Sequence, residues 1–279
     1  MRDKIEAILI PIPYCGILGY IVCSIPYYGI KFVEMKSLRK ISLVLDCFRP
    51  DEPRLGLQSI ADQTGLPKTT VHRLLASLRE IGLIVQDSNR DDYRLGLRLL
   101  SLGGIVLADL DVPRHAREPA ALLMNQIGES VHVCVFDGQN AVSVDRHEMA
   151  EGSNEIITLE REPSYCTGTG KAILAALSDD LAKALLTDPP ERFTSNTLTD
   201  QKKLMQDLAG IRLRGYSIDN EERQLGIRCI GAAIRHRNKV VGAISITGPK
   251  ERFPEARISI LADLVMATAA RISLSIENG

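Results

Sequence analysis

The sequence predicts an α+β protein with two domains, a small helical N-terminal domain and a larger domain in which helices and strands alternate. Its 279 residues suffice for two domains of roughly 100–200 residues each. The apolar content of 45% and the charged content of 25% exclude a disordered, collagen-like or coiled-coil chain. Residues 36–100 hold 11 Lys/Arg against 8 Asp/Glu, and residues 101–279 hold 20 against 24, so a mildly basic domain precedes a mildly acidic one.

Residues 1–34 differ in character from the rest. No charged residue occurs from Ala7 to Ile30, a run longer than the roughly 20 apolar residues of a membrane-spanning helix. Three prolines and three glycines interrupt this run, and both are poor residues for the interior of a helix. Three interpretations stay open: upstream sequence included through a mis-assigned start, an ordered or frayed extension, and a membrane anchor or secretory signal. We expect the first, and hence no membrane association.

Residues 35–97 predict three helices followed by a hairpin. The first helix has an apolar face that ends before Pro50, formed by Leu38, Ile41, Val44, Leu45 and Phe48. The second, LQSIADQTG, ends at Gly65, a residue that tolerates the left-handed conformation. The third is expected to begin at Pro67 and to bury Val71, Leu74, Leu75, Leu78 and Ile81. The segment LIVQDSNRDDYRLG then predicts two short strands around a polar turn, which is a wing.

Two helices joined by a short glycine turn, the second with polar groups exposed near its N-terminus, are typical of a helix-turn-helix. The side chains expected to face double-stranded operator DNA are Lys68, Thr69, Thr70, His72 and Arg73 on the helix, and Arg90 and Arg94 on the wing. Arg73 suits O6 and N7 of guanine, Lys68 suits a phosphate, and the wing arginines suit the minor groove or its phosphates. Any two short helices with a glycine turn share part of this pattern, but the basic face and the following hairpin favour DNA binding.

Residues 98–114 are predicted to be a linker helix. The segment RLGLRLLSLGGIVLADL is helical and apolar enough to pair between protomers. Because two-fold proteins read two-fold sites, we expect a homodimer or homotetramer on a pseudo-palindromic operator.

Residues 115–279 alternate between helix and strand. Helices are expected over 117–128, from Lys171 onward, over 199–215 and over 253–277, with hairpins over 130–147 and 227–248. A sheet flanked by helices is typical of a small-molecule sensor domain. The segment CTGTGKA is neither a Walker A loop, because Tyr165 and Ala172 are wrong for it, nor a dinucleotide fingerprint, because Ile173 replaces the last glycine.

What CTGTGKA predicts is a glycine-rich turn that enters a helix, where free N–H groups and the positive end of the helix dipole favour a carboxylate. Ser245 and Thr247 are two apart on a strand and therefore share a face. Cys229, Gly231 and Ala233 also share a face, and the small residues there are expected to leave room for a ligand. The alternatives are a turn without a ligand and hydroxyls that bond only to neighbouring backbone.

Six scattered cysteines without a C-x-x-C pair predict reduced thiols in the cytoplasm, with neither a metal nor a cofactor. A thiol enzyme would need Cys166 or Cys229 as nucleophile and His132 as base. No third residue that would orient this base is evident, so we expect a protein that is not an enzyme. The alternative to a regulator is a small-molecule sensor or thiol enzyme with a vestigial DNA-binding domain.

The segment from LQSIADQTGLPKTTVHRLLASLREIG through the wing resembles the DNA-binding domain of the IclR family of bacterial transcription regulators. ESVHVCVFDGQNAVSVDRHE, CTGTGKAILAAL, FTSNTLTD, LRGYSIDNEERQLGIRCIGAAI and VVGAISITGP resemble its effector domain in order and spacing. The resemblance runs from about Lys36 to the C-terminus. It implies effector-responsive repressors or activators in which a winged helix-turn-helix is joined by a linker helix to a GAF-like α/β effector-binding domain.

The resemblance also implies a set of effector-contacting positions, which are Gly168, Thr169, Asp219, Cys229, Ser245 and Thr247. Thr247 stands where serine is common in the family, and Thr169 where alanine is common. We expect the effector to be a small carboxylate, a hydroxy acid, keto acid or hydroxylated aromatic acid, and the target to be a catabolic operon.

Overall fold

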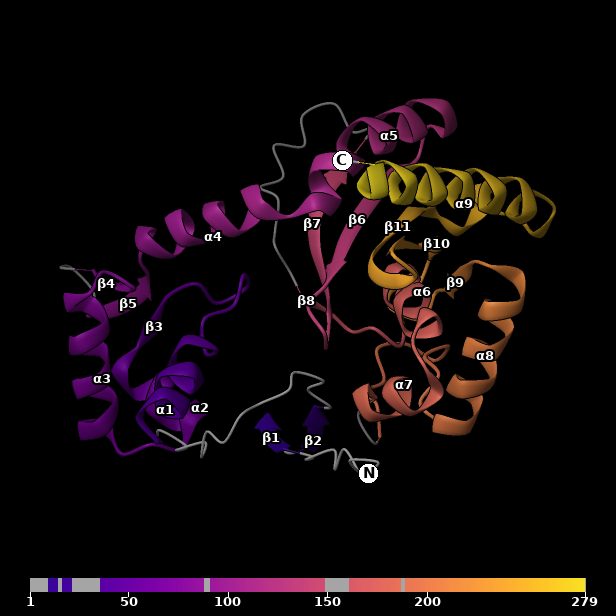
Figure 1. Cartoon of the computed structure of the whole chain (residues 1–279). Coiled ribbons are helices and arrows are strands. Elements are labelled where there is room, and N and C mark those ends of the chain that lie inside the picture. Colours follow the sequence, from indigo (N-terminus) through magenta and orange to yellow (C-terminus); the bar gives the residue numbers. More distant parts are fainter. Residues whose placement is uncertain are drawn as a thin grey trace, which may run out of the picture. The chain divides into compact units, whose positions relative to one another are not determined.

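The computed structural model describes residues 10–14, 17–21, 36–87, 91–148, 161–186 and 189–278 (Figure 1). The chain divides into two compact units. The N-terminal unit is Ile25–Asp109, and the C-terminal unit comprises Met1–Ser24 and Leu110–Gly279. The division falls within the segment 98–114 that the sequence assigns to a linker. Mixed helices and sheets in both units confirm the predicted α+β class.

The N-terminal unit is a winged helix-turn-helix. It contains α1 (Lys36–Leu45), α2 (Leu57–Thr64) and α3 (Lys68–Glu80), with a three-stranded antiparallel sheet in the order β3 (Leu55–Gly56), β5 (Asp92–Leu95), β4 (Ile84–Gln86). The amphipathic pattern builds one core from all three helices and the sheet, with Val44, Ile60, Val71, Leu75, Leu78, Ile84 and Tyr93 buried.

The turn between α2 and α3 fixes the helix-turn-helix geometry. Gly65 has φ 66° and ψ 14°, a left-handed conformation that favours glycine. Pro67 has ψ 136° and precedes α3, and its carbonyl accepts the N–H groups of Thr70 and Val71 at 2.8 and 3.1 Å. The expected start of the helix at Pro67 is therefore one residue early. Because α3 ends at Glu80, Ile81 lies outside the helix and is 47% exposed rather than buried as expected.

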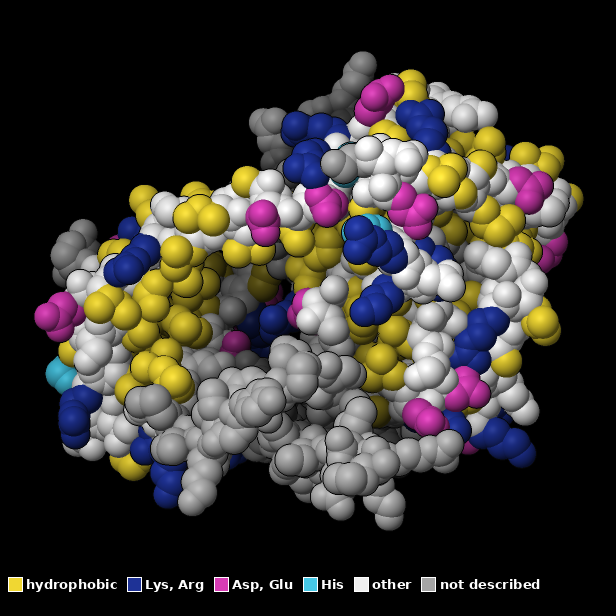
Figure 2. All heavy atoms as spheres, viewed as in Figure 1, with side chains coloured by type: hydrophobic (Ala, Val, Ile, Leu, Met, Phe, Trp, Pro, Cys, Tyr) yellow, Lys and Arg dark blue, Asp and Glu magenta, His cyan; other side chains and the backbone are white. Residues whose placement is uncertain are grey.

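The helix α4 (Leu97–Asp109) buries no side chain. Leu97, Leu100 and Ile105 are each about 70% exposed, and Figure 2 shows apolar side chains along this helix. It ends at Asp109, and after Leu110 the chain continues as α5 (Asp111–Ile127). Exposed apolar patches are common at interaction surfaces, and the pairing of this helix between protomers stays a prediction.

The C-terminal unit is built on one antiparallel six-stranded sheet with the order β8-β7-β6-β11-β10-β9 (Figure 1). The strands are β6 (Ser130–Phe136), β7 (Ala141–His147), β8 (Arg161–Glu162), β9 (Ser217–Asn220), β10 (Ile227–His236) and β11 (Lys239–Pro249). One face packs on α5 and α9 (Glu255–Asn278), and the main apolar core lies there. The other face carries α6 (Gly168–Ala176), which packs with α7 (Asp179–Leu185) and α8 (Gln201–Arg214) in a second cluster. A short 3-10 turn, η1 (Lys250–Arg252), precedes α9.

Alternation along the strands separates the two faces. Ile244 and Ile246 are fully buried in the core with α5 and α9, so Ser245 and Thr247 between and beside them point to the α6 face. By length and apolar composition α9 would suffice to cross a membrane, but its inner side chains belong to this core. Of residues 1–34, the described strands β1 (Ile10–Tyr14) and β2 (Ile17–Ile21) pair antiparallel. That this segment is dispensable stays a prediction.

Candidate functional site

The first turns of α3 expose the side chains that the sequence assigns to DNA. Lys68, Thr69, His72 and Arg73 are exposed and Thr70 is half-buried, while Val71 and Leu75 fill the core beneath them. A groove of about 590 Å³ runs along this face, lined by Thr70, His72, Arg73 and, from α1, Ser37 and Lys40. Sequence reasoning missed Lys40 because only the apolar face of α1 carried a pattern.

The wing is described on both sides of its tip. Asp87 N–H donates to the Asp92 carbonyl at 2.8 Å, which closes the hairpin. Arg94 lies on β5 with its guanidinium 4.0 Å from the Asp87 carboxylate, and Arg54 also pairs with Asp87. The predicted contact residue Arg90 lies outside the described residues.

The effector-contacting positions implied by the resemblance lie mostly on the α6 face of the sheet. Register places Asp219, Cys229 and Thr247 side by side on β9, β10 and β11, and in the next row Gly231 lies beside Ser245. The Thr247 hydroxyl donates to the Cys229 Sγ at 3.3 Å. Thr169, another position of the set, lies on α6 and faces β6. Its hydroxyl accepts a hydrogen bond from the Cys134 thiol at 3.4 Å, and its side chain is buried.

The N-terminus of α6 lies directly on this face. Thr167 is the N-cap, and its hydroxyl accepts the Gly170 N–H at 3.2 Å. The N–H groups of Gly168 and Thr169 have no hydrogen-bond partner among the described residues. These are the first donors of a helix, the kind of group that binds an anion.

The expected space above Gly231 is filled by α6. A β-carbon on Gly231 would come within 2.5 Å of the Gly168 carbonyl oxygen, and one on Gly168 would lie 3.5 Å from the Ser245 Cβ. Ser217 fixes this close approach, because its hydroxyl donates to the Gly168 carbonyl at 2.5 Å. The small residues admit a helix backbone, so the expectation that they leave room for a ligand is wrong at this point.

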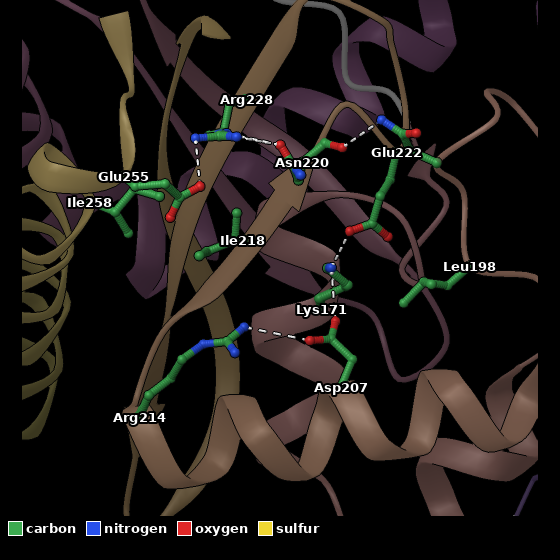
Figure 3. Close-up of a pocket in the computed structure, with 11 residues that line it drawn as sticks. Lys171, Leu198, Asp207, Arg214, Ile218, Asn220, Glu222, Arg228, Glu255 and Ile258 are labelled. Atoms are coloured by element: carbon green, nitrogen blue, oxygen red, sulfur yellow. Dashed lines mark hydrogen bonds and ion pairs between the residues drawn. The ribbon is translucent and has the colours of Figure 1, made fainter.

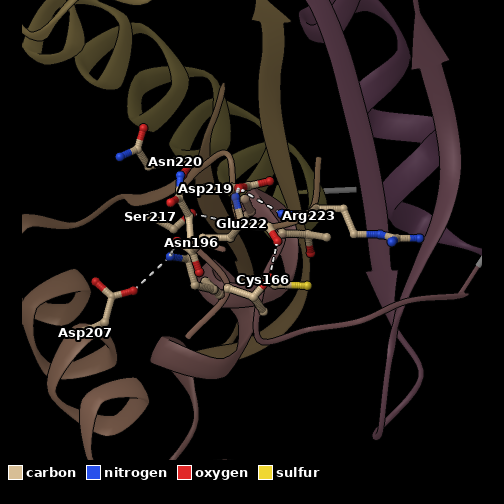
Figure 4. Close-up of polar contacts among 12 residues, drawn as sticks. Cys166, Asn196, Asp207, Ser217, Asp219, Asn220, Glu222 and Arg223 are labelled. Atoms are coloured by element: carbon tan, nitrogen blue, oxygen red, sulfur yellow. Dashed lines mark hydrogen bonds and ion pairs between the residues drawn. The ribbon is translucent and has the colours of Figure 1, made fainter. Parts of the chain in front are cut away.

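Asp219 lies near the end of β9, and its carboxylate accepts hydrogen bonds from the turn that follows the strand. Its Oδ1 accepts the backbone N–H groups of Glu222 and Arg223 at 2.7 and 3.4 Å, and Figure 4 shows these residues gathered around the carboxylate. Asp219 is 2% exposed. Burial, reinforced by the nearby Glu222 charge and opposed by these hydrogen bonds, raises the pKa of Asp219 to about 6.

A buried ionic cluster lies beside this turn, and sequence reasoning missed it. Lys171 of α6 is 1% exposed, and its Nζ donates to Glu222 at 2.5 Å and to Asp207 of α8 at 2.9 Å (Figure 3). Burial lowers the pKa of Lys171, but the two carboxylates outweigh burial and hold the pKa above its ordinary value, so the ammonium stays charged. Partners 36 and 51 residues away in sequence leave no local signal for such a cluster.

The ionic cluster borders a cavity of about 360 Å³ at the β9 edge, whose lining includes Lys171, Asp207, Arg214, Glu222 and Arg228. The Oε2 atom of Glu222 is buried without a hydrogen-bond partner among the described residues. Burial raises the pKa of Glu222, and Lys171 opposes this.

The thiols on this side of the sheet are unsuited to nucleophilic catalysis. Burial raises the pKa of Cys166 to about 12 and that of Cys229 well above its ordinary value, so both are protonated at neutral pH. Burial, with Arg146 nearby, lowers the pKa of His132 to about 3. A thiolate–imidazolium pair is not supported by these values.

Comparison with known proteins agrees with this arrangement. Residues 37–88 match the family model described as the IclR helix-turn-helix domain, and residues 105–274 match that of the bacterial transcriptional regulator IclR C-terminal domain. The HTH-type transcriptional repressor AllR of Escherichia coli K12 is 34% identical over 79% of this chain and 84% of its own length.

Two solved structures share the fold. An IclR-family regulator from Brucella abortus superposes with a TM-score of 0.77 at 25% identity, covering 89% of this chain and 96% of its own. An IclR homolog from Microbacterium hydrocarbonoxydans, crystallised with 4-hydroxybenzoate, superposes with a TM-score of 0.72 at 20% identity, covering 88% of this chain and all of its own. These relatives are regulators, and this chain is a regulator rather than an enzyme. With a helix-turn-helix domain and an effector-binding domain in the family's order, the chain belongs to the IclR family of bacterial transcription regulators.

Proposed function

We propose that this regulator binds a small organic acid on the α6 face of its C-terminal unit and thereby controls a catabolic operon. One observation carries the proposal. The unpaired N–H groups of Gly168 and Thr169 belong to the helix terminus that packs on Cys229 and Ser245, on the sheet face that also carries Asp219 and Thr247. Because α6 touches the sheet at Gly168, the ligand lies beside that contact, over the row of Asp219, Cys229 and Thr247.

The chemistry of this face favours a monocarboxylic acid with a second polar group. Two helix-terminal N–H groups suit one carboxylate. The Asp219 carboxylate repels a second carboxylate but accepts a hydrogen bond from a ligand hydroxyl. These groups support a hydroxy acid, a keto acid or a hydroxylated aromatic acid over a dicarboxylate. The 4-hydroxybenzoate in the Microbacterium relative belongs to this class.

The DNA-binding half of the proposal rests on the exposed N-terminal turns of α3. Arg73 can make a bidentate contact with guanine, and Lys68 lies where a phosphate meets the start of the helix. Thr69, Thr70, His72 and the wing arginines Arg90 and Arg94 complete the proposed contact set. The uncovered apolar side chains of α4 support a homodimer, or a homotetramer made of two such dimers, on a pseudo-palindromic operator in the cytoplasm.

Effector and operator would be coupled through a change in population. An acid that binds more tightly to one arrangement of the two N-terminal units shifts the protein toward that arrangement. The segment 98–114, which contains the division between Asp109 and Leu110 and all of α4 except Leu97, is the proposed link.

The test combines two measurements on the full-length protein. Electrophoretic mobility shift with the DNA upstream of its own gene and of the neighbouring genes tests operator binding. A thermal-shift panel of lactate, pyruvate, benzoate, 4-hydroxybenzoate and succinate tests the ligand class. We expect a sequence-specific shift, and stabilisation by at least one hydroxy, keto or aromatic monocarboxylate but not by succinate. Stabilisation without any specific DNA shift would favour a sensor with a vestigial DNA-binding domain.

A further inference from the structure

We propose that Lys171 and Glu222 form a positioning pair for the effector site. In this role Lys171 holds Glu222 against α6, and with it the turn after β9 whose backbone N–H groups bind the Asp219 carboxylate. The inference deepens the proposed function, because it takes Asp219 to be an effector-contacting residue. Neither Lys171 nor Glu222 belongs to the contact set implied by the family resemblance.

The first step is the connectivity of Glu222. Its backbone N–H donates to Asp219 Oδ1 at 2.7 Å, and its carbonyl accepts the hydroxyl of Thr197 at 2.6 Å and that of Thr194 at 3.2 Å. Its side chain accepts from Lys171 at 2.5 Å. One residue therefore ties the turn after β9 both to Asp219 and to the first turns of α6. Figure 4 shows Glu222 next to Asp219 and Arg223.

The second step is the unequal environment of the two carboxylates that Lys171 contacts. The Asp207 side chain is 22% exposed, and Arg214 lies 3.5 Å from its Oδ1. The Glu222 side chain is 7% exposed, and its Oε2 has no hydrogen-bond partner among the described residues. Lys171 is the cation that forms an ion pair with Glu222 in the part of the chain that the structure describes.

The third step follows from this difference. Without the Lys171 ammonium, Asp207 keeps Arg214 and water, whereas Glu222 is left as a buried carboxylate without a cation. An uncompensated buried charge is unfavourable, so Glu222 must move toward water or take up a proton. If it moves, its backbone N–H leaves Asp219, and the carboxylate on the proposed ligand face loses its fixed orientation.

The experiment measures amide hydrogen exchange on the full-length protein without ligand. The test variants are Lys171→Met and Glu222→Ala, of which the second removes the tether without leaving an unpaired carboxylate. Asp207→Asn removes the other partner of Lys171, and Lys202→Met is the control at an exposed lysine of α8.

In Lys171→Met and Glu222→Ala, exchange over residues 219–226 should accelerate at least tenfold, while the amides of β11 stay at wild-type rates. In Asp207→Asn and Lys202→Met this turn should remain protected. The proposal is overturned if the turn stays protected in Glu222→Ala, because its backbone hydrogen bonds would then suffice. It is equally overturned if Lys171→Met and Glu222→Ala accelerate exchange in β11 as much as in the turn, because Lys171 would then serve overall stability alone.

The second readout is affinity for the acid that gives the largest thermal shift in the panel above, measured by calorimetry. We expect about tenfold weaker binding in Lys171→Met and in Glu222→Ala, and no further loss in the double variant. Asp207→Asn should bind like wild type. Additive losses in the double variant would contradict a pair that acts as one unit. If no acid in the panel binds wild type, the proposed ligand class fails, whereas hydrogen exchange still decides the positioning role.

Discussion

The two units of this regulator place their candidate functional groups in opposite environments. In the N-terminal unit, Lys68 and Arg73 are exposed on the polar side of a helix whose other side forms the core. In the C-terminal unit, Asp219 and Ser245 are 2–3% exposed, and Lys171 is buried between two carboxylates. In the first arrangement, the residues that stabilise the fold are largely different from those that contact DNA. In the second, the groups that would bind a ligand also determine whether the domain is stable, so the two units should respond differently to comparable substitutions.

The largest effect that would test this contrast is expected at Asp219. Its pKa is about 6 in the folded protein and about 4 in an unfolded chain, so the folded state binds the proton more tightly. Stability is therefore lost as the pH rises from about 4 to about 6, and the cost persists above pH 6. Asp219→Asn removes this cost and keeps an oxygen that can accept the two backbone N–H groups. Chemical denaturation at pH 7.5 should show the C-terminal unit stabilised by about 2–3 kcal/mol.

The same variant should lose most of this advantage at pH 4, because the Asp219 carboxyl of the folded wild-type protein is then protonated and uncharged, and that comparison is the control. An Asp219→Asn protein that is less stable than wild type at pH 7.5 would mean that the carboxylate is stabilising, and the buried-site account would be wrong. We expect Asp219→Asn to be more stable than wild type and to bind the acid differently, because a buried charge that serves binding lowers stability.

A second substitution tests the close approach of α6 to the sheet. Gly231→Ala would bring a methyl group within 2.5 Å of the Gly168 carbonyl oxygen, so α6 must shift. We expect the C-terminal unit to lose about 1–3 kcal/mol. Gly103→Ala in α4 is the matched control, since nothing lies within 4 Å of its added methyl group and the helix gains about 1 kcal/mol. The melting temperature should fall for Gly231→Ala and rise for Gly103→Ala. Equal shifts in the two variants would contradict the close contact between Gly231 and Gly168.

In the N-terminal unit, substitution should change binding without changing stability. Arg73→Ala should weaken operator binding by about 1–3 kcal/mol, because it removes a bidentate base contact, while the melting temperature stays within error. Arg49→Ala is the control, since Arg49 is exposed in the turn after α1 and lies near Asp51 and Glu52. Fluorescence anisotropy with operator and with scrambled DNA measures the DNA affinity of both variants. If Arg73→Ala binds operator like Arg49→Ala, then Arg73 does not read a base.

The smallest effect is expected for the removal of residues 1–34. A protein that begins at Met35 should fold, remain in solution and bind operator with unchanged affinity, because α1, the first described helix of the winged domain, begins at Lys36. Size-exclusion chromatography and the anisotropy assay measure these properties. Association of the full-length protein with membranes, lost in the shortened one, would instead support an anchor.

The two units also differ in how much of their structure the sequence predicts. Apolar periodicity located α1 to α3, the wing and the long hairpins β6–β7 and β10–β11, because each of these elements buries one regular face. It missed β9 and α7, which are short elements of four and seven residues. On the DNA surface, helical periodicity predicts which side chains of α3 are exposed. It did not predict Lys40, which lies on α1.

The interior of the C-terminal unit was predicted less well, because its contacts join distant segments. Strand alternation predicted that Ser245 and Thr247 share a face of the sheet, as they do, and the family resemblance pointed to Asp219. Nothing local indicates that Gly231 accommodates the Gly168 carbonyl, or that Lys171 bonds to Glu222 and Asp207. Such pairings depend on the tertiary fold, so sequence spacing alone does not reveal them.

The most direct test of the account is release from, or recruitment to, operator DNA as the acid from the thermal-shift panel is added. Wild type and the double variant Ser245→Ala/Thr247→Val should bind operator with equal affinity in the absence of the acid, because both changes lie in the C-terminal unit. As the acid is added, we expect wild type to change its operator affinity at least tenfold and the double variant to show no response. If the double variant responds to the acid with the wild-type midpoint and amplitude, the effector does not bind on this face of the sheet.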